Sequence, residues 1–187
     1  NLKLLKSPAK TVIVGFLHDV VEDYGQDAKN WNKPEESERL KGLKPFTLED
    51  VREIFGDEIA KSVDAISKVT DGKKKKTEQY YDGIANDPYA SVAKLEDRIN
   101  NLQSMLTVFT LEKQKDYADD VVKYFIPMLK KAEKNFPEQS DIYQNLNNRL
   151  KSQIKGVFAQ VEIFQNLGLS LDQVPSKVKA SNTEPIV

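Results

Sequence analysis

The sequence contains no cysteine, no long apolar run and almost no excess of charge of either sign. Without cysteine, the chain has no disulfide, no thiolate nucleophile and no cysteine zinc site. No apolar stretch approaches the roughly 20 residues that cross a bilayer, and no signal-peptide pattern opens the chain. The net charge of −1 argues against the basic excess that is typical of non-specific nucleic-acid binding. We therefore expect a soluble cytoplasmic protein that binds neither nucleic acid nor membrane.

The length of 187 residues is enough for one domain with a proper core. We place that domain at residues 1–170 and a flexible C-terminal tail at 171–187. Residues 25–46 are polar, charged and broken by proline and glycine, which predicts a surface insertion. The chain opens at Asn1 with a helical pattern already under way, so we expect part of the N-terminal region to lie upstream.

Hydrophobic spacing is helical almost throughout, and this predicts an all-α fold. Ser7 and Pro8 are typical of a helix start, and Gly25 of a helix end. Further helices are predicted over 47–56, 57–70, 77–85, 88–109, 111–134 and 139–166. At the start of the first of these, Thr47 and Asp50 resemble a capping pair, with aspartate in place of the usual Glu or Gln. In the helix at 57–70, the residues expected to face the core are Ile59, Val63, Ile66 and Val69. The lysines that follow this helix form a solvated surface in the plain interpretation, and an attractor of anions in the other.

The first polar cluster lies in the otherwise apolar helix that ends near Gly25. Residues four apart share a helix face, so His18 stacks with Glu22 and Asp19 with Asp23. Buried ionisable groups are costly unless they are paired or coordinate a metal. Imidazole and carboxylates favour Mn²⁺, Mg²⁺ or Fe²⁺. The alternative interpretation is a set of exposed polar side chains in the last turn of an amphipathic helix.

A second cluster lies in the segment from residue 92 to 105. Helical spacing places four polar side chains on one face, namely Lys94, Asp97, Arg98 and Asn101. The opposite side carries four apolar side chains, namely Leu95, Ile99, Leu102 and Leu106. That face offers an acid, two cations and an amide. Ion pairs on a solvated helix would give the same pattern.

Together the two segments, "HDVVED" at 18–23 and "KLEDRINN" at 94–101, resemble two motifs of the HD-domain superfamily of metal-dependent phosphohydrolases. The RelA/SpoT-type (p)ppGpp hydrolases, the branch of small alarmone hydrolases among them, are the most similar. The connecting segment and the run into the second motif are also similar, and the resemblance covers about residues 8–135. It implies an HD-domain helical bundle and hydrolysis of the 3′-pyrophosphate of (p)ppGpp, a small-molecule nucleotide substrate.

The resemblance also implies roles for individual residues. The implied ligands of a divalent metal, with Mn²⁺ the expected ion, are His18, Asp19 and Asp97. The acids implied to position or deprotonate the attacking water are Glu22 and Asp23. The side chains implied to bind the nucleotide or support the site are Lys94, Arg98 and Asn101.

Departures from the family pattern leave alternatives open. The family needs a second histidine upstream of His18, which is the only histidine in this sequence. Asn100 and Gln103 replace a usual histidine and a common arginine, and the insertion at 25–46 occupies a short link of many relatives. The alternatives are an HD phosphohydrolase for NADPH or a deoxynucleotide, and a helical binding module with an incomplete metal site.

Overall fold

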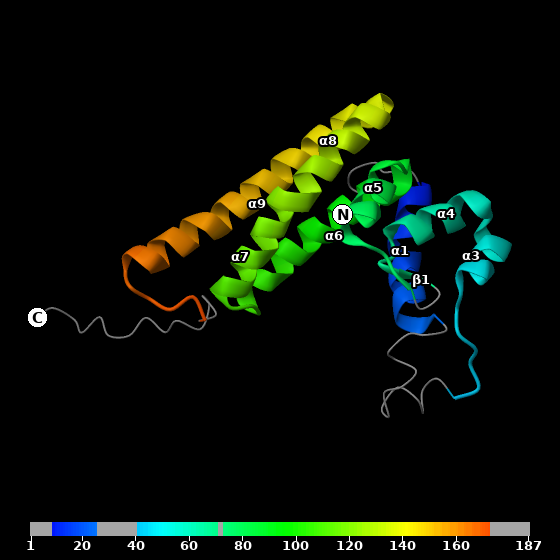
Figure 1. The fold of residues 1–187 in the computed structure, drawn as a ribbon, viewed down its shortest axis with the longest axis horizontal. Helices are drawn as coiled ribbons and strands as arrows, with labels where there is room; N and C mark the ends of the chain where they lie inside the picture. The colour runs from blue at the N-terminus through cyan, green and yellow to red at the C-terminus, as the bar shows by residue number, and fades with distance from the viewer. Residues whose placement is uncertain (1–8, 26–40, 71–72, 173–187) are drawn as a thin grey trace, which may run out of the picture. The chain divides into compact units, whose positions relative to one another are not determined.

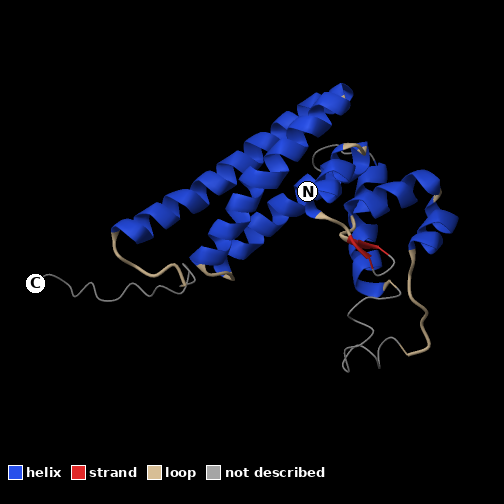
Figure 2. Cartoon of the chain, in the orientation of Figure 1, coloured by secondary structure: helices blue, strands red, loops and turns tan. Residues whose placement is uncertain are grey.

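The computed structural model describes residues 9–25, 41–70 and 73–172. These residues are helical apart from connections and one pair of two-residue strands, as Figure 2 shows. The α-helices are α1 (Ala9–Tyr24), α3 (Leu48–Phe55), α4 (Asp57–Ile66), α5 (Thr77–Ala85), α6 (Pro88–Ser104), α7 (Leu111–Asp120), α8 (Ile126–Asn135) and α9 (Ser140–Asn166). The strands are β1 (Val69–Thr70) and β2 (Lys73–Lys74), which pair antiparallel. The all-α fold class predicted from the sequence is confirmed. None of the helices in this part of the chain is long and apolar enough to cross a membrane.

The described residues fall into two compact units. The first takes its residues from 1–97 and 128–143, and the second from 98–127 and 144–187. The boundaries between the units fall within α6, α8 and α9. The single domain at 1–170 stays a prediction. The predicted tail begins at Leu171 and lies almost wholly outside the described residues.

Helix α1 ends where the sequence predicted. The amide of Gly25 donates to the carbonyl of Val21 at 3.0 Å and closes the last turn. A Cβ atom on Gly25 would lie 2.4 Å from that same carbonyl oxygen, so only glycine fits without rearrangement. The predicted start at Ser7 and Pro8 lies outside the described residues, as does most of the predicted insertion.

The first unit is built around α4, which packs against α1, α3 and α5 (Figure 1). The larger apolar side chains that these four helices bury completely are Val14, Val51, Val63, Ile66 and Ile84. Burial of such a side chain contributes roughly 1.5–3 kcal/mol relative to exposure. Of the four side chains predicted to face the core from the helix at 57–70, Ile59, Val63 and Ile66 are buried.

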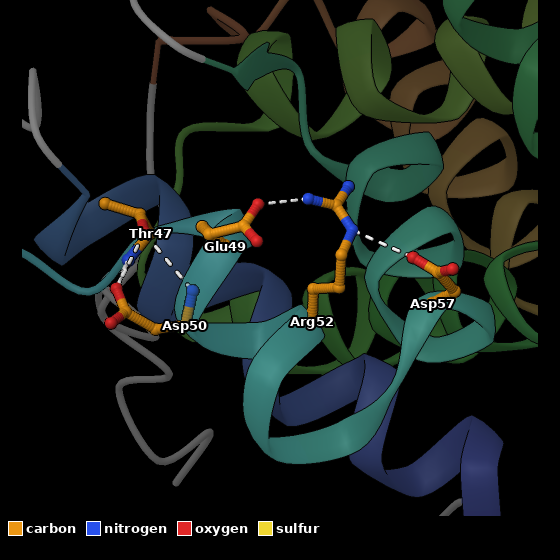
Figure 3. Close-up of polar contacts among 5 residues, drawn as sticks. All are labelled: Thr47, Glu49, Asp50, Arg52 and Asp57. Carbon is orange, nitrogen blue, oxygen red and sulfur yellow. Dashed lines mark hydrogen bonds and ion pairs between the residues drawn. The ribbon is translucent and has the colours of Figure 1, made fainter.

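Helix α3 begins with a reciprocal cap that the sequence indicated (Figure 3). The Thr47 hydroxyl accepts from the Asp50 amide at 3.3 Å, and the Asp50 carboxylate accepts from the Thr47 amide at 2.7 Å. Asp50 thus does what a Glu or Gln usually does in this motif. The hydrogen bonds from Thr47 lower the pKa of Asp50. Arg52 pairs with Glu49 within the helix and with Asp57 beyond it, where Nε lies 2.9 Å from the carboxylate.

Helix α4 is shorter than predicted. It ends at Ile66 rather than near residue 70, and Ser67 takes an extended conformation with φ −77° and ψ 129°. Val69 is 40% exposed, so its predicted place in the core is wrong. The β-branched pair Val69 and Thr70 favours a strand, and it pairs with β2.

In the second unit, the helix predicted over 88–109 ends at Ser104 and continues as a 3₁₀ turn, Met105–Thr107. The buried amide of Gln114 donates to the carbonyls of Leu106 and Phe109 at 3.3 and 2.9 Å. These bonds hold the connection between α6 and α7. The helix predicted over 111–134 contains a π-helical turn, Val121–Phe125, between α7 and α8.

Candidate functional site

The histidine of the first motif is buried near the end of α1. His18 is 3% exposed, and its Nδ1 lies 2.9 Å from the carbonyl oxygen of Gly15. A carbonyl only accepts hydrogen bonds, so Nδ1 carries a proton and Nε2 is the atom that remains free to accept one. Nε2 lies 3.1 Å from Oδ1 of Asp19. Two atoms with lone pairs at this distance need a proton or a cation between them.

The carboxyl group of Asp19 interacts electrostatically with charged side chains of both motifs. Its side chain is 69% exposed, yet neighbouring atoms partly desolvate the carboxyl group, and this is the main reason why its pKa is raised. The charges of Asp97 and Glu22 also raise this pKa, whereas those of His18 and Lys94 lower it. Residues far apart in the sequence are thus close enough in the first unit for their charges to interact.

The acid of the second motif, Asp97, forms an ion pair with Lys94, which lies one turn earlier on the same helix. Nζ of Lys94 is 3.0 Å from Oδ2 of Asp97, and the two side chains are 10% and 28% exposed. Glu96, between them in the sequence, is 1% exposed. The structure thus contains an ion pair of the kind that the alternative interpretation expected, but in largely buried surroundings.

The two acids at the end of α1 have different surroundings. Glu22 is half-buried, and its Oε1 accepts a hydrogen bond from the backbone amide of Lys68 at 2.6 Å. Asp23 is exposed. The sequence predicted both acids as a pair, but it gave no signal for the Lys68 amide, because a backbone donor leaves no trace in residue type.

Arg98 belongs to the second unit and lies between two aromatic rings. It is 8% exposed, with its guanidinium carbon 4.8 Å from the ring centroid of Tyr117 and 4.3 Å from that of Phe125. Its Nη1 is buried and has no hydrogen-bond partner among the described residues. The sequence predicted Arg98 as a supporting cation, but the two aromatic partners were missed.

Asn101 lies exposed at a pocket of about 210 Å³ in the second unit. The pocket is lined by Asn101, Ser104, Met105, Val108, Phe109 and Tyr117. An apolar wall with a few polar groups is typical of small-molecule sites. Only Asn101 among these residues was predicted from the sequence.

The donors of the first unit fit a divalent ion in part. Nε2 of His18 and Oδ1 of Asp19 converge, and a nitrogen with carboxylate oxygens suits such an ion. No group of three or more histidine or acidic side chains among the described residues is arranged to hold a metal, and the Asp97 carboxylate is bound to Lys94. The structure therefore provides a two-donor pair with a third acid nearby.

Comparison with known proteins gives distant and partial similarity. The chain is 30% identical over 126 residues to the guanosine-3′,5′-bis(diphosphate) 3′-pyrophosphohydrolase of Aquifex aeolicus, which covers 64% of this chain and 15% of that protein. It is 34% identical over 104 residues to the protein of the same description from Spiroplasma citri, covering 51% and 11%. A GTP pyrophosphokinase of Streptomyces coelicolor is 28% identical over 124 residues, covering 63% and 12%.

The chain is thus distantly similar to RelA/SpoT-type proteins and spans at most 15% of the length of these three relatives. No protein-family model matches the chain. No solved structure matches it significantly.

Proposed function

We propose that this chain is a metal-dependent phosphohydrolase that removes the 3′-pyrophosphate of (p)ppGpp. The observation that carries the proposal is the close approach of a buried imidazole to a carboxylate, with Nε2 of His18 3.1 Å from Oδ1 of Asp19. The charge of Asp97 in the second motif also acts on this carboxyl group. Similarity to two proteins described as guanosine-3′,5′-bis(diphosphate) 3′-pyrophosphohydrolases supports the substrate class.

The residues that would hold the metal are His18, Asp19 and Asp97. The bond to Gly15 holds the imidazole with Nε2 toward Asp19, which is the orientation that a ligand needs. When bound, a divalent ion such as Mn²⁺ supplies positive charge for the phosphoryl oxygens and acidifies water.

Glu22 and Asp23 would hold the attacking water and accept its proton. Glu22 is the better placed for this, because its half-buried carboxylate is already held by a backbone donor. The roles that the resemblance implies for Arg98 and Asn101, binding of the nucleotide and support of the site, remain part of the proposal. Phosphoryl transfer depends mainly on positioning and charge stabilisation, so the mechanism needs no protein nucleophile.

The experiment that tests the proposal combines metal analysis with turnover of the full-length protein. We expect stoichiometric divalent metal by elemental analysis, and release of pyrophosphate from ppGpp in the presence of Mn²⁺. Glu22→Gln, which keeps the size and one acceptor oxygen of the side chain, should retain the metal and lose most of the turnover. Turnover of ppGpp that is equally fast in Glu22→Gln would contradict the role of this acid.

A second candidate keeps the chemistry and changes the substrate. Asn100 and Gln103, which differ from the family pattern, are both exposed on α6. These differences favour a different substrate, such as NADPH or a deoxynucleotide. A screen of phosphorylated nucleotides for released phosphate or pyrophosphate separates the two.

A third candidate is a helical binding module without catalysis. It is favoured by the finding that only two metal donors converge in the described part of the chain. This candidate requires that the full-length protein bind nucleotide without a transition metal and without turnover.

A further inference from the structure

The end of α4 is a tightly held turn. The carbonyl of Val63 accepts from both the amide and the hydroxyl of Ser67, at 3.1 and 2.8 Å. The carbonyl of Ile66 accepts from the phenol of Tyr80 at 2.7 Å. Ser67 is fully buried. The last carbonyls of a helix lack partners within it, and here side chains from two elements supply them.

Hydrogen bonds and an ion pair also hold the residues that follow the turn, Lys68 to Thr70. The Lys75 amide donates to the Lys68 carbonyl at 3.0 Å, and Nζ of Lys75 lies 2.8 Å from Oδ1 of Asp64. The hydroxyl of Thr70 donates to the same oxygen of Asp64 at 2.8 Å. The backbone around Lys68 therefore has few conformations open to it.

This backbone meets the proposed catalytic acid. The Lys68 amide donates to Oε1 of Glu22 at 2.6 Å, across 46 positions in the sequence. A hydrogen bond to an ionised carboxylate is stronger than one between neutral groups. It also holds the Glu22 side chain in one rotamer, so the rotamer entropy is lost on folding and not when the attacking water is ordered.

We propose that the Ser67–Lys68 turn is a positioning element for Glu22. The Lys68 amide occupies Oε1 and so leaves Oε2 as the oxygen that holds the attacking water. This inference rests on the proposed hydrolase function. Its physical basis is that a displaced catalytic group loses much of the benefit of proximity.

The positioning role belongs to the backbone of Lys68 and not to its side chain. The ammonium group lies 6.0 Å from the ring centroid of Tyr80, where it makes a cation–π contact. Lys68→Ala therefore keeps the donor to Glu22, whereas Lys68→Pro removes it. The extended conformation of Ser67 is the one that a residue before proline adopts.

The first arm of the test compares these two variants of the full chain. We expect Lys68→Pro to lower kcat for ppGpp by roughly 10- to 100-fold. Its KM and Mn²⁺ affinity should stay within about twofold of wild type, because a positioning defect acts on the reacting water and not on binding. Lys68→Ala should keep the wild-type kcat. A folded Lys68→Pro protein with wild-type kcat would overturn the proposal.

The second arm does not depend on activity or on the folding of the proline variant. Amide hydrogen exchange at Lys68 should be slow in the wild type and in Glu22→Gln, whose amide oxygen can still accept. Exchange should become faster in Glu22→Ala and stay slow in the matched control Asp23→Ala. Unchanged protection in Glu22→Ala would overturn the role of the turn, even in an active enzyme. A different outcome is that protection of the Lys68 amide is lost in Glu22→Ala while the wild-type protein hydrolyses no nucleotide. This outcome would overturn the hydrolase function, and with it the catalytic role of the turn.

Discussion

The charged side chains of the two motifs, on α1 and on α6, differ in how much water they meet. On α1 the side chain of Asp19 is 69% exposed and Asp23 is also exposed. On α6 the side chains of Lys94 and Asp97 are 10% and 28% exposed, and Glu96 is buried. Charges in a protein interior must be paired, so those of α6 constrain the fold. The exposed acids of α1 are solvated and need no such pairing.

We infer from this difference that the exposed acids on α1 serve the proposed chemistry, whereas the buried charges on α6 also support the packing. Repulsion from Asp97 and Glu22 adds to desolvation in raising the pKa of Asp19. A group kept in an unfavourable electrostatic setting is a candidate for function. We therefore expect changes on α1 to affect activity more than stability, and changes on α6 to affect stability first.

Asp19→Asn should have the largest effect, and on function alone. Removal of the charge weakens a proposed metal ligand, and we expect a loss of at least about 100-fold in Mn²⁺ affinity and turnover. The thermal unfolding midpoint of the metal-free protein should not fall. Desolvation and the charges of Asp97 and Glu22 together outweigh the attraction of His18 and Lys94, so the charged form of Asp19 is on balance unfavourable in the folded protein. Elemental analysis, ppGpp turnover and thermal unfolding measure the three quantities.

The matched control for this substitution is Asp116→Asn on α7, an exposed acid of the second unit. It should change neither metal content nor turnover. Wild-type metal affinity in Asp19→Asn would contradict the ligand assignment. A lowered unfolding midpoint would show that Asp19 supports the fold, and the comparison between the two motifs would fail.

Lys94→Met should have the next largest effect, on stability. Methionine keeps much of the side-chain length but removes the cation 3.0 Å from the Asp97 carboxylate. Because both side chains are largely buried, we expect the free energy of unfolding to fall by about 1–3 kcal/mol. Urea unfolding at neutral pH measures this change.

Asp97→Asn provides the second edge of a double-mutant cycle with Lys94→Met. The double variant should be less destabilised than the sum of the two single ones. If the losses of unfolding free energy were additive, the interaction between Lys94 and Asp97 would contribute nothing to stability. The buried charges on α6 would then be stabilised by other contacts.

The sequence predicted the repetitive parts of the molecule well. Apolar spacing placed α5 at 77–85 and α9 within one residue of its observed start, because a helix repeats its pattern over many residues. The cap of α3 was legible because both partners lie within one turn, at Thr47 and Asp50. Signals of this kind are local.

What the sequence missed depends on contacts between distant residues. The end of α4 at Ile66 is set by Tyr80 and Ser67, which no periodicity reveals. The rings that flank Arg98 come from α7 and the π-helical turn after it. At the site, the residue types of both motifs could be named from their resemblance to a family. The hydrogen bond from Lys68 to Glu22 could not, because its donor is the backbone.

Tyr143→Phe should have a smaller effect that depends on pH. The buried phenol lies 2.7 Å from the Ser91 hydroxyl on α6, and burial raises the pKa of Tyr143 to about 12. Loss of this hydrogen bond should cost about 1 kcal/mol at neutral pH. Because the folded state holds the proton more tightly, the phenol stabilises the wild type fully below pH 10. That stability is lost as the pH rises from 10 through 12.

The difference in unfolding free energy between wild type and Tyr143→Phe should therefore shrink above pH 10. Urea unfolding at pH 7, 9 and 11 measures it, and lysine titration is common to both proteins and cancels. A difference that is constant with pH would mean that the phenol is not buried as described.

Phe16→Ser should have the smallest effect and gives the sharpest test of the exposed side of α1. Phe16 is a large apolar side chain of α1, yet it is 73% exposed, whereas Leu95 on α6 is fully buried. Serine and phenylalanine have similar helix propensities, so we expect a change within about 0.5 kcal/mol. Leu95→Ala, the control, should cost about 2–5 kcal/mol. A loss in Phe16→Ser as large as that in Leu95→Ala would mean that another surface covers Phe16 in solution, and that α1 is not the exposed partner in this comparison.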